Sequence, residues 1–111
     1  MAGRYVPKAG DIVWLHFDPQ AGHEHAGHRP ALVISPSNYN GKTSLMLCCP
    51  MTTQSKGYPF EVKIAGARSG VVLADQVMSL DWVVRKAKHK GKASATELAE
   101  VRAKISALIG C

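Results

Sequence analysis

The sequence lacks an apolar run long enough to cross a membrane, because such a span needs about 20 consecutive apolar residues. Its opening residues, MAGRYVPKAGD, carry charge without a following apolar stretch, so they do not indicate a secretory signal. Repeats, low-complexity tracts and linkers are also missing. We therefore expect a cytoplasmic protein without membrane contact, folded as one domain over residues 1–111.

Cysteine is scarce, with three residues and no CxxC spacing that would indicate a zinc or redox site. Cys48 and Cys49 are adjacent, so in a strand their side chains point to opposite faces. Cys111 is the last residue of the sequence. The odd count predicts reduced thiols in a reducing compartment and excludes a fold built on disulfides. No motif supports a catalytic cysteine.

Acidic residues are few, with eight Asp and Glu against fourteen Lys and Arg, which gives a formal net charge of +6. A small basic domain suits an anionic partner such as a nucleic acid or an acidic polypeptide. Charge alone leaves open the alternative of a basic surface that only keeps the protein soluble.

Short apolar and β-branched runs predict a mainly β fold. We expect strands at residues 11–17, 30–34, 45–51 and 60–64, and one or two more within residues 70–84. The runs at 30–34 and 45–51 are continuously apolar, which is typical of strands covered on both faces. Residues 60–64 alternate instead, which places Phe60, Val62 and Ile64 on one face. Residues 35–42 suit a turn or one turn of helix.

The clearest helix closes the chain. Ser94 is a plausible N-cap, and Glu97 three residues later completes a capping box. Apolar residues then follow at helical spacing, and Gly110 is placed to end the helix: Leu98, Val101, Ile105 and Leu108. Five or six short strands and one amphipathic helix describe a small curled sheet or barrel with the helix packed against it.

A polar loop at residues 18–29 gathers three histidines, a glutamate and an arginine. One interpretation is a metal site, because neutral imidazoles at His23, His25 and His28 could converge on zinc or nickel. Against it, ligand spacing within a loop is weakly specific, and a solvated polar loop explains the same residues. We expect no metal.

A second interpretation of these residues needs no metal. RNA carries its own nucleophile, the 2′-hydroxyl, so a ribonuclease must position it, move protons and neutralise charge on the phosphate oxygens. Arg29 suits the last task, because a guanidinium stays charged and grips phosphate in bidentate fashion. Pro30 disfavours a helical backbone at Arg29 and so holds it extended. A structural salt bridge is the alternative role for Arg29.

Four further residues belong to this interpretation. Thr52, at the end of the expected strand 45–51, is able to donate a hydrogen bond to phosphate, although a strand-end threonine is more often a turn residue. Glu24 is able to orient a base or accept a proton, although an exposed loop glutamate usually faces solvent. In a second loop at residues 52–59, Tyr58 offers a stacking face. Lys56 offers a phosphate partner there.

These residues make the sequence resemble the MazF/PemK toxins, the mRNA interferases of type II toxin–antitoxin systems. The likeness runs through nearly the whole chain, in RYVPKAGDIVWLHFDP, GHEHAGHRPALVISP, PMTTQSKGYPFEV, GVVLADQVMSLDW and KISALIG. Its most specific parts are G-x-E-x-x-G-x-R-P at residues 22–30 and TTQSKGYPFEV at residues 52–62. Within the family the sequence looks most like the MazF of enteric bacteria.

The resemblance implies an SH3-like small barrel, the CcdB/MazF/PemK fold, assembled as a homodimer. It implies sequence-specific, metal-independent cleavage of single-stranded RNA to 2′,3′-cyclic phosphate and 5′-hydroxyl ends, with no cofactor. The family arginine and threonine match Arg29 and Thr52, and its loop glutamate matches Glu24. We add His28, beside Arg29, as an auxiliary proton carrier.

The resemblance also implies which residues bind RNA. They lie in the two loops and in the segment GVVLADQ at residues 70–76: His23, Thr53, Gln54, Lys56, Tyr58, Asp75 and Gln76. The Kid branch of the family uses an Arg-x-Asp pair for proton transfer. This sequence keeps Asp75 but has Leu73 in place of the arginine, which favours Arg29 with Thr52 as the catalytic pair.

The resemblance implies a protein partner, and it leaves two alternative functions to be weighed. An acidic MazE-like antitoxin, disordered until bound, would cover the basic surface and block RNA. A CcdB-like gyrase poison shares the barrel, but that activity goes with a Trp-Gly-Ile chain end, whereas this chain ends Leu-Ile-Gly-Cys. A catalytically silent nucleic-acid-binding module is the other competitor, and the joint presence of Glu24, Arg29 and Thr52 argues against it.

Overall fold

The computed structural model describes residues 5–16, 28–66 and 70–111. The strands in this part of the chain are β1 (Asp11–His16), β2 (His28–Val33), β3 (Leu45–Thr52), β4 (Glu61–Ile64), β5 (Gly70–Leu73), β6 (Met78–Asp81) and β7 (Lys88–Lys92). The helices are α1 (Ser37–Thr43) and α2 (Ala95–Ile109), with a short 3₁₀ turn, η1 (Ala74–Gln76). The predicted mainly β fold with a C-terminal helix is confirmed. The expected five or six strands were too few, since β7 was missed.

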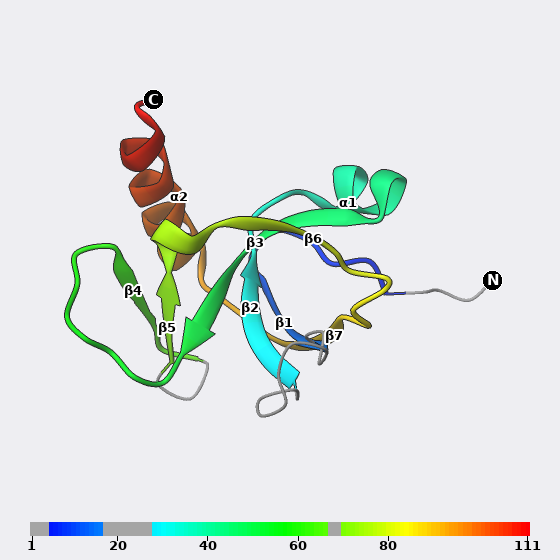
Figure 1. Ribbon diagram of the computed structural model, residues 1–111, viewed down its shortest axis with the longest axis horizontal. Coiled ribbons are helices and arrows are strands. Elements are labelled where there is room, and N and C mark those ends of the chain that lie inside the picture. Colours follow the sequence, from blue (N-terminus) through cyan, green and yellow to red (C-terminus); the bar gives the residue numbers. More distant parts are fainter. Residues whose placement is uncertain (1–4, 17–27, 67–69) are drawn as a thin grey trace.

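All strand pairs in the sheet are antiparallel, in the order β4-β5-β3-β2-β1-β7, with β6 also paired to β3. One edge of β3 serves two partners: its first half pairs with β6 and its last two residues pair with β5. The sheet curls into a half-barrel, with α2 beside its β4–β5 end (Figure 1).

Alternating side chains of the strands fill two separate cores, one on each side of the curled sheet. The first core lies under α2 and contains Ile12, Leu32, Cys49, Met51, Val62, Ile64, Val72, Ala74 and Val101. The second contains Val13, Leu15, Ala31, Val33, Met46, Cys48 and Trp82. The expectation of coverage on both faces is therefore confirmed for the strand at 30–34 and for the second half of the strand at 45–51. It is wrong for the first half of the latter, where Leu45 and Leu47 are 36% and 41% exposed.

The two adjacent cysteines report this division directly. Cys48 belongs to the second core and Cys49 to the first, and both are free and fully buried. Burial is the largest cause that raises the pKa of each thiol from 9.0 to about 12. Cys111 is free and exposed. The predicted opposite orientation of Cys48 and Cys49 is confirmed.

Helix α2 begins and ends as its sequence predicts. The Ser94 hydroxyl accepts from the Glu97 N–H, and the Glu97 carboxylate accepts from the Ser94 N–H, so the capping box is complete. Gly110 ends the helix in the left-handed conformation. Val101 is buried in the first core, with Leu98 and Ile105 packed against it. Leu108, expected on the same apolar stripe, is instead 56% exposed because it lies in the last turn.

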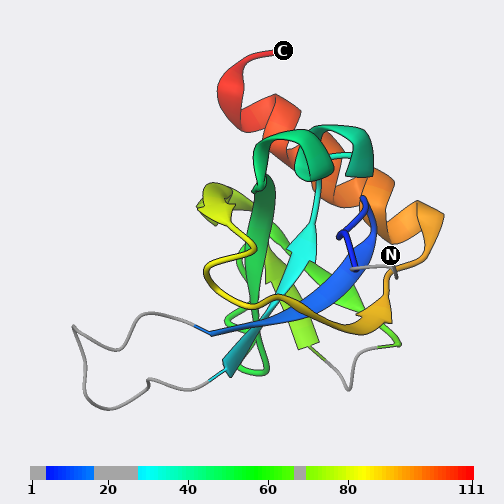
Figure 2. The ribbon, with the colours of Figure 1, turned by 90° about the vertical axis from the view of Figure 1, so that its right-hand side faces the viewer.

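Two further expectations need correction. The strand at 60–64 begins at Glu61, and only Val62 and Ile64 join the core, because Phe60 lies ahead of the strand. Residues 35–42, expected to form a turn or one turn of helix, lead into a longer helix, the seven-residue α1. Both helices lie above the strands in Figure 2, whereas β2 begins at the opposite end of the molecule.

Candidate active site

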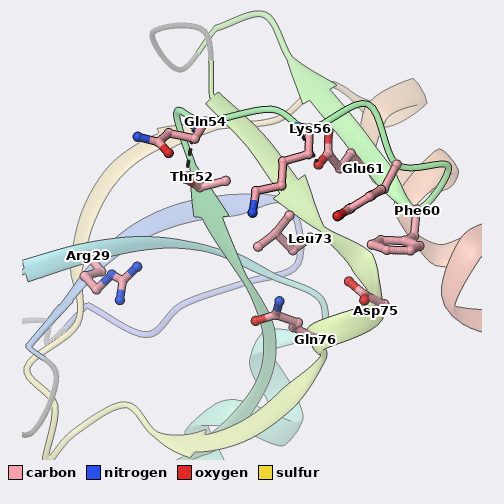
Figure 3. Close-up of a pocket in the computed structure, with 10 residues that line it drawn as sticks. Arg29, Thr52, Gln54, Lys56, Phe60, Glu61, Leu73, Asp75 and Gln76 are labelled. Carbon is pink, nitrogen blue, oxygen red and sulfur yellow. Dashed lines mark hydrogen bonds between the residues drawn. The ribbon is translucent and has the colours of Figure 1, made fainter.

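A pocket of 390 Å³ opens where the start of β2, the end of β3 and the β4–β5 pair meet. It is lined by Arg29, Thr52, Gln54, Lys56, Tyr58, Phe60, Glu61, Leu73, Asp75 and Gln76. The residues drawn in Figure 3 come from β2, β3, β4, β5, the β3–β4 loop and η1, and the Lys56 amino group extends into the space between them.

Strand alternation brings the pocket residues to one face. Glu61 pairs directly with Leu73, and the registers of β3 with β2 and β5 place Arg29 and Thr52 on that same face. This is the face that carries the second core further along the sheet. That core ends at Ala31, and beyond it the same face is open.

Arg29 and Thr52 stand on regular, paired backbone, which fixes their directions. Arg29 pairs with Leu15 of β1, and its side chain is exposed at the pocket rim. Thr52 is half-buried, and its hydroxyl accepts a hydrogen bond from the Gln54 N–H at 3.1 Å. Because a hydroxyl both accepts and donates, Thr52 keeps its hydrogen for another acceptor.

The loop at residues 53–60 forms the opposite wall and carries an aromatic pair. The rings of Tyr58 and Phe60 lie 5.3 Å apart between centroids, tilted by 37°. Tyr58 is 51% exposed, so one side of this pair is open to a ligand. An exposed aromatic beside a lysine is typical of sites that stack an unpaired base and contact its phosphate.

Carboxylates complete the pocket. Glu61 accepts hydrogen bonds from the loop, chiefly from the Ser55 hydroxyl, and these hold the pKa of its carboxyl below the ordinary value. Asp75 lies on η1 directly after β5, and η1 is joined to the loop by the Ala74 N–H, which donates to the Phe60 carbonyl at 3.2 Å. The pocket thus combines two cations, Arg29 and Lys56, with two acidic groups.

Most of the predicted site residues meet in this pocket. Seven of them line it: Arg29, Thr52, Gln54, Lys56, Tyr58, Asp75 and Gln76. Thr53 is exposed but lies outside the lining. His23, Glu24 and His25 lie outside the described residues, as does the side chain of His28.

The prediction missed Phe60 and Glu61 as lining residues and treated Leu73 only as a departure from the family pattern. Alternation had placed Phe60 on one face with Val62 and Ile64, and a loop-end glutamate gives no signal of its own. Among the described residues, no three His, Cys, Asp or Glu side chains lie close enough to hold a metal ion. None of the helices described here has the length and apolarity to span a membrane.

Comparison with known proteins gives concordant matches. The family model described as PemK-like, MazF-like toxin of type II toxin-antitoxin system matches residues 8–109. The endoribonuclease toxin MazF of Escherichia coli strain K12 is 57% identical over 111 residues, covering 99% of this chain and 100% of that one. The endoribonuclease PemK of Escherichia coli is 31% identical over 106 residues, covering 90% and 80%.

Solved structures agree with the sequence matches. MazF from Deinococcus radiodurans superposes with a TM-score of 0.87 at 56% identity, over 97% of this chain and 100% of that one. A MazE–MazF structure from the same organism gives a TM-score of 0.86 at 51% identity, over 96% and 98%. This chain therefore belongs to the family of PemK-like, MazF-like toxins of type II toxin–antitoxin systems.

Proposed function

We propose that this chain is a sequence-specific endoribonuclease toxin that cuts single-stranded RNA without a metal. The relatives named above are endoribonucleases, and their likeness covers the chain from end to end. The observation that carries the proposal is the pocket itself. It gathers Arg29 and Thr52 from two strands and faces them with Lys56 and Tyr58 from a loop.

The reaction we propose is an internal transesterification. The 2′-oxygen attacks the adjacent phosphorus and gives its proton to a base, while the 5′-oxygen leaves and takes up a proton. The products are a 2′,3′-cyclic phosphate and a 5′-hydroxyl. Nothing is oxidised or reduced, so no cofactor is needed.

Arg29 and Thr52 stabilise the negative charge that develops on the phosphate oxygens. Arg29 pairs with the non-bridging oxygens, since a guanidinium offers several donors in one plane. Thr52 donates its hydroxyl hydrogen, because its acceptor side already faces the Gln54 N–H. Proton transfer falls to Glu24 and His28, which the sequence places in the first loop beside Arg29.

The second wall binds the RNA chain. Tyr58 stacks an unpaired base, and Lys56 contacts a phosphate. The bases around the cut are contacted by a set of polar residues: His23, Thr53, Gln54, Asp75 and Gln76. Because a net charge of +6 favours RNA through counterion release, raising the salt concentration should weaken RNA binding before it unfolds the protein. Binding that stays constant from low to high salt would contradict this electrostatic part.

We further propose that the toxin works in the cytoplasm as a homodimer and is neutralised by an acidic MazE-like antitoxin. A MazE–MazF structure is among the matches, and an acidic polypeptide suits the basic surface. The comparisons do not favour a gyrase poison on the same barrel.

The decisive experiment incubates the purified protein with a long single-stranded RNA in EDTA and maps the 5′ ends of the fragments. Discrete cuts at one short sequence, retained in EDTA and lost in Arg29→Ala, are expected. Intact RNA under every condition would instead indicate the catalytically silent binding module. Cleavage that is lost on adding EDTA would overturn the metal-free mechanism and return attention to His23, His25 and His28.

A further inference from the structure

We propose that Glu61 is a positioning residue, whose carboxylate shapes the tip of the β3–β4 loop so that Lys56 and Tyr58 engage the RNA. The inference rests on the proposed function, because it assigns a task to the loop only if the pocket binds RNA. Glu61 was not among the residues that the sequence pointed to. It is the first residue of β4 and lines the pocket floor beside Leu73.

The carboxylate gathers three donors from three consecutive residues. Its Oε1 accepts from the Ser55 hydroxyl at 2.7 Å and from the Gly57 N–H at 3.1 Å. Its Oε2 accepts from the Lys56 N–H at 3.0 Å. The Glu61 N–H in turn donates to the Tyr58 carbonyl at 3.1 Å. One side chain therefore fixes the backbone that carries both proposed RNA contacts.

The same contacts argue against a role for Glu61 in proton transfer. Hydrogen bonds from the Ser55 hydroxyl and the loop N–H groups stabilise the ionised carboxylate and hold its pKa below the ordinary value. Both oxygens are already occupied by loop donors. Such a carboxylate is suited to holding a backbone in place.

The rest of the loop is anchored by other groups, so the influence of Glu61 is confined to the tip. The Lys104 ammonium donates to the Pro59 carbonyl at 2.6 Å, and the Ala74 N–H donates to the Phe60 carbonyl. At the tip, Gly57 adopts a φ of +75°, a left-handed conformation that glycine adopts without the steric cost it has for other residues. Loss of the Glu61 carboxylate should loosen Lys56 and Tyr58 and leave Phe60 in place.

Glu97 provides a matched control. Its carboxylate also accepts from two backbone N–H groups, those of Ala65 at 2.9 Å and Ser94 at 2.8 Å, and these contacts lower its pKa as well. It lies away from the pocket, at the start of α2. A glutamate that only stabilises the fold should therefore behave like Glu97, whereas a positioning glutamate should change how the protein binds RNA.

The experiment compares Glu61→Ala and Glu97→Ala with the native chain on a long single-stranded RNA whose cut site has been mapped. Glu61→Ala should raise KM about ten-fold with kcat changed by about two-fold or less, since it removes uniform binding. The Kd for an oligonucleotide with a 2′-deoxy group at the cut should rise by the same factor. Glu97→Ala should lower the denaturation midpoint and leave KM and Kd unchanged. Ser55→Ala, which keeps the carboxylate, should raise KM only about three-fold.

A double-mutant cycle separates positioning from general damage. In a Lys56→Ala/Tyr58→Ala background, Glu61→Ala should change KM by about two-fold or less, because the groups it positions are already gone. A full ten-fold effect in that background would overturn the inference, as would an unchanged KM in Glu61→Ala alone. If the native protein leaves RNA intact, the proposed function fails. If it cuts and loses cleavage in Arg29→Ala while Glu61→Ala keeps its KM, this inference alone fails.

Discussion

The two faces of the β2–β3–β5–β4 sheet use neighbouring residues of the same strands for opposite purposes. One face is closed by α2, and its side chains are buried: Leu32, Met51, Val62 and Val72. On the other face, at the same end of the sheet, the side chains are exposed or half-buried and line the pocket: Arg29, Thr52, Leu73 and Glu61. On β3, β4 and β5 the two sets are one residue apart, and on β2 Leu32 lies three residues from Arg29.

This arrangement allows stability and activity to be changed separately. The residues under α2 contribute to the free energy of folding mainly through the apolar area that they bury. The pocket residues instead carry charged and hydrogen-bonding groups, which would be costly to bury in the core. The strands hold both sets in register, so the pocket gains rigidity from the core on the opposite face. Substitutions under α2 should therefore lower the free energy of unfolding, whereas substitutions in the pocket should lower RNA cleavage or binding.

The largest expected difference concerns the reactivity of the thiols, because Cys48 and Cys49 are buried within the two cores whereas Cys111 is exposed. A rise in pKa from 9.0 to about 12 lowers the thiolate fraction of each buried thiol. The reduction is about 1,000-fold at a given pH. Alkylation of the native protein, followed by mass spectrometry, should label Cys111 alone. Rapid labelling of Cys48 would show that the second core is open.

The same shifts predict how stability depends on pH. The folded pKa of each thiol lies above its unfolded value, so the contribution to stability is fully present below pH 9.0 and is lost as pH rises toward about 12. Chemical denaturation along a pH series should show this decline. A Cys48→Ala/Cys49→Ala variant should be less stable at neutral pH but show a shallower decline at alkaline pH. An equal slope in both proteins would contradict the assignment.

Alternation explains which parts of the fold the sequence predicted. Strands with an apolar face, such as β2 and β3, were identified because burial imposes a pattern on them. Strand β7 was missed because KHKGK has no apolar face to bury: among the strands of the described residues it pairs with β1 alone, at the edge of the sheet. Edge strands rich in lysine avoid pairing with other chains, and that pressure removes the pattern by which a strand is recognised.

Part of the candidate site could also be predicted, since seven of the residues that line the pocket had been named from the sequence. Arg29 and Thr52 carry a chemistry that is readable from residue type and family pattern. Glu61 acts through contacts with Ser55, Lys56 and Gly57, and no periodicity encodes a loop closing onto the strand that follows it. Phe60 was placed on the same strand face as Val62 and Ile64 because alternation does not say where a strand begins.

The next expected effect is on the closed face. Leu32 is fully buried under α2, three residues from Arg29 on the same strand. Leu32→Ala should lower the free energy of unfolding by roughly 3 kcal/mol, through lost burial and the cavity left behind. Its kcat and KM, measured under conditions where the variant is folded, should match the native values.

Arg29→Ala is the matched variant on the open face of β2. It should abolish cleavage and change the free energy of unfolding by about 1 kcal/mol or less. Urea denaturation and RNA cleavage, run on both variants, check the pair. A large fall in activity for folded Leu32→Ala would show that the two faces are coupled.

A smaller effect is expected at the end of β3. Thr52→Val keeps a branched side chain of similar shape and removes the hydroxyl, so kcat/KM should fall about ten-fold if that hydroxyl donates to phosphate. Thr52→Ser retains the hydroxyl and should stay close to the native value. If Thr52→Val and Thr52→Ser lose activity equally, the methyl group and its packing matter more than the hydrogen bond.

The smallest effect is expected at Gly57, where the pocket wall depends on backbone conformation. Its φ of +75° disfavours any residue with a Cβ, yet no heavy atom beyond Gly57 and its two chain neighbours lies within 4 Å of the position that a Cβ would occupy. Gly57→Ala should therefore cost about 1 kcal/mol as backbone strain, without a clash.

The effect of Gly57→Ala on RNA binding depends on which contacts of residue 57 shift to relieve the backbone strain. Because Glu61 holds the Gly57 N–H, relaxation at Gly57 should weaken the contact with the carboxylate and raise KM about three-fold. In a Glu61→Ala background the same substitution should leave KM nearly unchanged, since the contact is already absent. Equal effects of Gly57→Ala in both backgrounds would mean that the loop tip shapes the pocket without its carboxylate anchor, and the open face would then owe its geometry to the loop backbone alone.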